Sequence, residues 1–172
     1  MDRAGVAQVG LGRSGEPAVA TGVAILDHLL AELARAGGLE LRLEIAPGEP
    51  EAEVEAAGRT LGEALAPLLA AAGAPGHGAG IVPADEALAL VAVEASGRPL
   101  VLSNADLAST RAGGLQTDLA AVFLRELAEA AGLTVHVRLL EGEDSQHVLS
   151  AIFKALGAAL ADAAAPRDHD ER

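Results

Sequence analysis

This chain contains the same order of elements, helix then strand then helix, twice, and the repeat constrains its fold more than any other feature. The first copy contains LARAGGLELRLEI and the second contains LAEAAGLTVHVRLL. Any two Leu/Ala-rich helices resemble one another, but matching glycines and a matching element order favour duplication of an α+β half. Three matched pairs lie 94 residues apart: Leu33 with Leu127, Gly38 with Gly132, and Leu41 with Val135. Two more lie 95 residues apart: Leu61 with Leu156, and Leu65 with Leu160.

Hydrophobic periodicity predicts where the elements of each copy lie. Leucines at helical spacing indicate a first helix, with Asp27 as a plausible cap and Gly37-Gly38 as its end. A connector rich in Gly and Pro, residues 73–87, is expected to contain at most a short strand. Helices are predicted over residues 25–38, 51–73, 117–132 and 145–165. Strands are predicted over 39–45 and 133–140, and two more within 88–103, one on each side of a Ser-Gly-Arg-Pro turn. The predicted units are a first half, 1–84, a second half, 85–165, and a disordered tail, 166–172.

Composition limits the classes of function that the chain can have. It has no Trp or Tyr and only 2 Phe among 172 residues, so Leu, Val, Ile and Ala must form the core. A net charge of −13 with so few aromatic residues argues against nucleic-acid binding. The absence of Cys excludes disulfides and thiol chemistry. No apolar run reaches the length of a membrane span and no signal-peptide core is present, so we expect a cytoplasmic protein without a membrane partner.

Two of the five histidines, His28 and His147, lie near the start of a predicted helix. His28 follows Asp27, whose carboxylate could orient the imidazole. Each histidine alone is more readily explained by a surface or capping role than by ligand binding.

Two basic residues also stand out. Lys154 is the only lysine beside eleven arginines, and it lies seven residues after His147, on roughly the same helical face. Arg98 occupies the turn between two strands, where it could meet an anion or simply be solvated.

Three segments together resemble the imidazoleglycerol-phosphate dehydratase family of histidine biosynthesis. They are TGVAILDHLLAELARAGG, PADEALALVAVEASGRPL and LTVHVRLLEGEDSQHVLSAIFKALGAAL, and the resemblance extends from about Thr21 to about Ala161. It implies a duplicated fold of the ribosomal protein S5 domain 2-like type, in which each half is a sheet with two helices. It also implies a large cage-like homo-oligomer and a small phosphorylated imidazole substrate.

The resemblance further implies a site for two manganese ions, held in the family by a His-His-x-x-Glu motif in each half and one more histidine per half. The first motif corresponds to Glu51-Ala52-Glu53-Val54-Glu55, and the second to Gln146-His147-Val148-Leu149-Ser150. The additional histidines correspond to His28 and Val122. The implied manganese ligands in this chain are therefore His28, Glu55 and His147, with Glu51 as a further candidate.

Arg98 and Lys154 match positions that contact the substrate phosphate in the family, whereas a usual glutamine of the first helix is Glu32 here. Two functions follow from this pattern. The chain is either a divergent manganese-dependent dehydratase, or a non-catalytic paralogue that acts as a structural partner in a hetero-oligomer or binds a phosphorylated metabolite.

Overall fold

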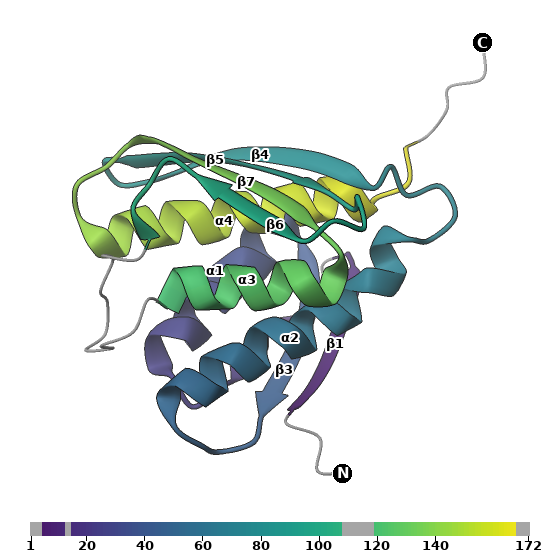
Figure 1. Ribbon diagram of the computed structural model, residues 1–172, viewed down its shortest axis with the longest axis horizontal. Helices are drawn as coiled ribbons and strands as arrows, with labels where there is room; N and C mark the ends of the chain where they lie inside the picture. The colour runs from purple at the N-terminus through teal and green to yellow at the C-terminus, as the bar shows by residue number, and fades with distance from the viewer. Residues whose placement is uncertain (1–4, 13–14, 108–118, 168–172) are drawn as a thin grey trace.

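A computed structural model describes residues 5–12, 15–107 and 119–167 of the chain. In the described residues, four helices lie between two β-sheets, with the second sheet at the top of the view in Figure 1 and β1 and β3 of the first sheet at its lower right, behind α2. The α+β prediction is confirmed, and most of the predicted tail lies outside the described residues. The elements in chain order are β1 (Gly5–Leu11), β2 (Ala18–Ala20), α1 (Ala24–Gly37), β3 (Leu39–Ile45), α2 (Pro50–Leu69), β4 (His77–Ala84), β5 (Ala87–Glu94), β6 (Leu100–Ser103), α3 (Leu119–Ala131), β7 (Thr134–Glu141) and α4 (Ser145–Ala164).

The repeat is visible in the pairing of the strands. The first sheet has the order β1-β3-β2, in which β3 pairs antiparallel with β1 and parallel with β2. The second sheet has the order β4-β5-β7-β6, in which β7 pairs antiparallel with β5 and parallel with β6. Each half therefore contains the same three-stranded unit, and β4 adds a fourth strand to the second sheet.

Strand β3 shows why the sheets have one apolar face. Its residues alternate between buried and exposed along LELRLEI, because successive side chains of a strand point to opposite sides. The buried leucines face the helices, while Arg42 and Glu44 face away from them. Charged residues can thus occupy a central strand without entering the core.

The helices of one half pack on helices of the other half, α1 on α4 and α2 on α3. The only two phenylalanines, Phe123 of α3 and Phe153 of α4, are fully buried, and their ring centroids lie 5.4 Å apart. Aliphatic side chains fill the rest of this core, as the composition predicts.

Strand β4 is longer than the sequence indicated, since the connector was expected to hold at most a short strand and β4 spans 8 residues. Gly78 and Gly80 lie against the α4 backbone, where a side chain would collide with carbonyl oxygens of the helix. Pro83 is tolerated because β4 is an edge strand, whose outer side meets no other strand of the described residues. The predicted boundary at residue 84 falls at the turn between β4 and β5, so β4 shares its sheet with strands of the second half.

Helix α4 is long and apolar enough, by length and composition, to cross a membrane, but 67% of its apolar window is buried inside the protein. It covers β4 and β5 and packs on α1. These contacts are those of a central core helix.

Candidate functional site

His147, in the first turn of α4, lies among carboxylates from two segments. Its Nδ1 atom lies 2.6 Å from Oε2 of Glu86, and its Nε2 atom lies 3.4 Å from Oδ2 of Asp85. Both acids belong to the two-residue turn between β4 and β5, in which Asp85 has a φ of 51°. Asp144 caps α4 by accepting hydrogen bonds from the backbone N–H groups of Gln146 and His147.

This arrangement favours the charged forms of the His147–Glu86 pair. The pKa of Glu86 is lowered to about 2, mainly because the backbone N–H of Asp144 donates to its carboxylate, with further contributions from its own backbone N–H and from His147. The pKa of His147 is raised above 6.5, first by its hydrogen bond to Glu86. Both ring nitrogens of His147 face carboxylates: Nδ1 shares a hydrogen bond with Glu86, and Nε2 lies within ion-pair distance of Asp85.

His28 lies on α1 with its side chain 59% exposed, and its Nε2 atom lies 3.3 Å from Oε1 of Glu32, one helical turn away. The prediction that Asp27 caps this helix and could orient His28 is wrong. The N-cap is Val23, and the Asp27 carboxylate accepts hydrogen bonds from the backbone N–H and the hydroxyl of Thr21. Asp27 therefore fixes the loop that enters α1.

Helix α2 begins beside that loop. Glu53 is buried, and its Oε1 atom accepts a hydrogen bond from the backbone N–H of Gly48 at 3.0 Å. Its carboxylate lies against Gly22, where any side chain would collide with it. The candidate ligands Glu51 and Glu55 lie on the same first turns of α2, exposed and partly buried respectively.

The two predicted phosphate ligands lie on different elements. Arg98 is exposed in the turn before β6, whose backbone is fixed by Ser96 and Thr134: the Ser96 hydroxyl accepts from the Arg98 N–H, and both hydroxyls donate to the Arg98 carbonyl oxygen. Lys154 is partly buried in the middle of α4. No ion pair or hydrogen bond of the described residues joins them.

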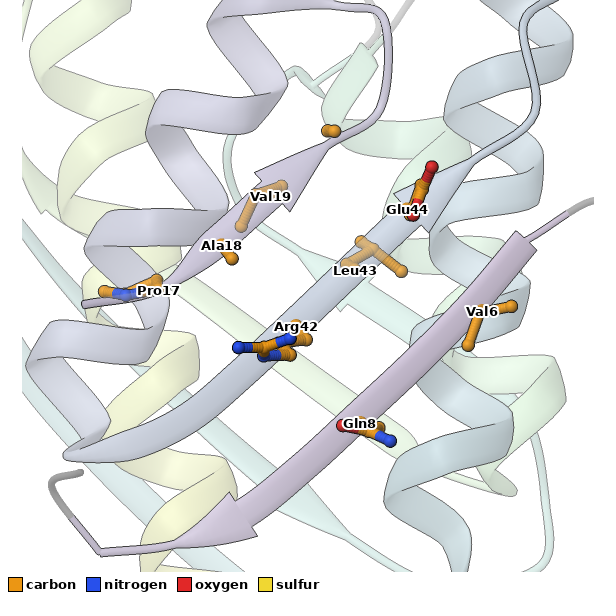
Figure 2. Close-up of a pocket in the computed structure, with 9 residues that line it drawn as sticks. Val6, Gln8, Pro17, Ala18, Val19, Arg42, Leu43 and Glu44 are labelled. Carbon is orange, nitrogen blue, oxygen red and sulfur yellow. The ribbon is translucent and has the colours of Figure 1, made fainter. Parts of the chain in front are cut away.

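A hollow of about 580 Å³ lies over the open face of the first sheet (Figure 2). Arg42 and Glu44 of β3 line its floor, with Gln8 of β1 beside Arg42 in the strand register. None of the predicted site residues lines it.

Comparisons with known proteins agree with the geometry of the fold. The family model described as imidazoleglycerol-phosphate dehydratase matches residues 21–160. The chain belongs to this family. The resemblance read from the sequence is therefore confirmed, and the family is one of lyases in histidine biosynthesis.

Individual relatives match over most of their length. The imidazoleglycerol-phosphate dehydratase of Moorella thermoacetica is 41% identical, covering 91% of this chain and 82% of the relative. That of Clostridium botulinum strain Kyoto is 37% identical, covering 96% and 85%. The crystal structure of the Staphylococcus aureus dehydratase superposes with a TM-score of 0.83 at 32% identity, covering 94% of this chain and 93% of that one. The Pyrococcus furiosus structure, in complex with (S)-C348, gives a TM-score of 0.82 at 31% identity, covering 100% and 96%.

The candidate manganese ligands do not form a metal centre within one described chain. Across residues 5–12, 15–107 and 119–167, no group of three or more His, Asp or Glu side chains is placed to hold a metal ion. His147 is bracketed by Glu86 and Asp85 on opposite ring nitrogens, and His28 is beside Glu32. At positions where the family has ligands, Ala52 and Val122 have no donor atoms. The donor set of one chain thus does not fit a two-metal site, and manganese binding stays a prediction.

Sequence reasoning missed Asp85, Glu86 and Glu53. The adjacent acids in VPADEALAL, placed in a turn between two apolar segments, were a visible signal, but their partner lies 61 residues away from Glu86. Glu53 gave no signal, since glutamates surround it on α2 and only this one is buried.

Proposed function

We propose that this chain is a non-catalytic member of the imidazoleglycerol-phosphate dehydratase family that serves histidine biosynthesis as a structural partner of a complete dehydratase. A subunit with this role keeps the fold and the surfaces through which it assembles, while its own site loses the groups needed for chemistry. The cytoplasm is the compartment that fits this role.

The observation that carries the proposal is the absence of side-chain donor atoms at Ala52 and Val122, two positions where the family has metal ligands. A metal-bound imidazole must offer a nitrogen lone pair to the ion, and metal binding displaces any proton from that nitrogen. In His147, which remains, both ring nitrogens face carboxylates: Nδ1 faces Glu86 and Nε2 faces Asp85. His147 is therefore placed to tie α4 to the turn before β5.

The residues at the other family ligand positions support the same proposal. Dehydration in the family depends on metal ions that act on the substrate imidazole, and the resemblance assigns their ligands to positions that here are Ala52, Val122, Gln146 and Ser150. Loss of one supporting contact near a metal costs roughly ten- to a hundredfold in affinity or activity. The loss of several direct ligands should cost far more.

Complementation of a histidine auxotroph that lacks its dehydratase tests the proposal. The chain expressed alone should not restore growth, whereas the Moorella thermoacetica dehydratase, as positive control, should do so at similar expression. A tagged copy should also co-purify with a complete dehydratase from its own cell. Growth on the chain alone would show that it turns over substrate.

A divergent, active dehydratase is the second candidate, and the 37% to 42% identity to curated dehydratases favours it. In that case His28, Glu55, His147 and Glu51 would hold manganese, and the substrate phosphate would bind at Arg98 and Lys154. The complementation experiment separates the two candidates.

A further inference from the structure

Glu32 of α1 has a carboxylate oxygen without a visible partner. Its Oε2 atom is buried and accepts no hydrogen bond from any residue that the structure describes. The other oxygen, Oε1, faces the exposed His28 ring. A carboxylate oxygen that is removed from water without a donor is costly, so a donor is expected to reach this atom.

The internal repeat indicates which donor this is. A side chain on Gly62 of α2 would collide with the carbonyl oxygen of Leu127, and a side chain on Gly157 of α4 would collide with that of Leu33. Gly157 follows Gly62 by 95 residues and Leu127 follows Leu33 by 94, as the sequence repeat requires. The same helix crossing is therefore built twice, by α2 on α3 and by α4 on α1.

One crossing carries an ion pair near this contact. A guanidinium nitrogen of Arg59 on α2 lies 3.2 Å from Oε2 of Glu126 on α3. By the same offsets of 94 and 95 residues, Glu32 is equivalent to Glu126 and Lys154 is equivalent to Arg59. The two carboxylates are also buried to the same degree, with side chains 14% exposed for Glu126 and 16% for Glu32.

Lys154 is thus the cation equivalent to Arg59. It is partly buried on α4, and no described residue forms an ion pair or hydrogen bond with it. The Oε2 atom of Glu32 and the ammonium of Lys154, both without a partner in the described residues, thus occupy the positions equivalent to Glu126 and Arg59, which form an ion pair.

We propose that Glu32 and Lys154 form the second of two equivalent ion pairs between the repeats, and that Glu32 thereby keeps Lys154 from binding an anion. The ammonium donates to Oε2 of Glu32, and an incoming phosphate would have to displace this carboxylate while lying close to its negative charge. Glu32 is in this sense a specificity-determining residue. The inference goes beyond the proposed function, and it is incompatible with the second candidate function, in which Lys154 binds the substrate phosphate.

A double-mutant cycle tests the ion pair. E32Q and K154M remove one charge each and keep most of the side-chain volume. Each should lower the urea midpoint of unfolding, and the midpoint of the double variant should be no lower than that of the less stable single variant. The charge swap E32K/K154E should recover part of the lost stability. The cycle of R59M and E126Q is the matched control for a pair that the structure shows. Strictly additive losses, or a K154M midpoint equal to that of wild type, would overturn the pair.

Inorganic phosphate, followed by the shift in melting temperature, tests the effect on anion binding. Phosphate should raise the melting temperature of wild type no more than that of K154M. It should raise the melting temperature of E32Q, and this rise should be absent in E32Q/K154M. If E32Q gains no response, Glu32 does not control Lys154. If wild type responds and K154M removes the response without lowering stability, Lys154 is an anion ligand and the proposal is wrong.

Discussion

The Nδ1 atom of His147 lies 2.6 Å from a carboxylate oxygen of Glu86, which joins the first turn of α4 to the turn between β4 and β5. The Glu86 carboxylate also accepts a hydrogen bond from the backbone N–H of Asp144, the residue that caps α4. One side chain thus fixes both the imidazole and the backbone that leads into the helix.

The Glu86–His147 contact predicts a pH dependence. The pKa of His147 is raised, so its contribution to stability is fully present below pH 6.5 and is lost as pH rises through its folded-state pKa. The pKa of Glu86 is lowered to about 2, so its contribution is present above pH 4.5 and is lost as pH falls towards 2. The melting temperature of wild type should therefore exceed that of E86Q most clearly between pH 4.5 and 6.5.

A titration of His147 followed by NMR checks the cause directly. Its pKa should lie above 6.5 in wild type and should fall in E86Q. An unchanged His147 titration in E86Q would show that Glu86 is not the residue that raises its pKa.

Helix packing predicts unequal effects of three Gly→Ala substitutions. G157A places a methyl group against the Leu33 carbonyl oxygen and G62A places one against that of Leu127, so both force the helices apart. Each should destabilise the protein by about 1–3 kcal/mol, although alanine favours a helix more than glycine does. G48A is the control, because nothing lies within 4 Å of its added methyl group, and it should change stability by less than about 0.5 kcal/mol. Urea unfolding of the three variants measures the difference, and equal losses would contradict the close approach.

The elements whose apolar pattern is local were predictable from the sequence, and those set by distant contacts were not. Leu39–Ile45 was predicted with the bounds that the structure shows, because its alternation reports one buried face. In β4, by contrast, Gly78 and Gly80 resembled turn residues but serve as contact points for α4. Only the fold shows that these glycines make room for a helix about 80 residues further along.

The candidate site divides in the same way. His28 and His147 were correctly placed near helix starts, since helical periodicity fixes such positions. Their partners were not predicted, because Glu86 and Asp85 approach His147 only when β4 and β5 lie on α4. The burial of Glu53 likewise depends on the loop at Gly22, on another segment.

The open faces of the two sheets predict self-assembly. Large apolar side chains are exposed there, with Ile81 60%, Val6 55% and Leu140 51% accessible. Exposed apolar side chains that gather on one face commonly mark a contact with another chain. We expect an assembly well above a dimer, and the double variant I81E/L140E should shift it to smaller species in light scattering. A stable wild-type monomer at micromolar concentration would contradict this expectation.

Metal content gives the last prediction. With Ala52, Val122, Gln146 and Ser150 at positions where the family has ligands, the purified chain should not retain two manganese ions per subunit after dialysis near neutral pH. A variant with E51H, A52H, V122H, Q146H and S150E returns imidazole and carboxylate donors to those positions and should bind manganese. The same variant without A52H and V122H is the matched control, and it should bind less because two direct ligands are missing. Elemental analysis of the three proteins measures the outcome, and about two manganese ions per wild-type subunit would show that this chain assembles a metal centre from other donors.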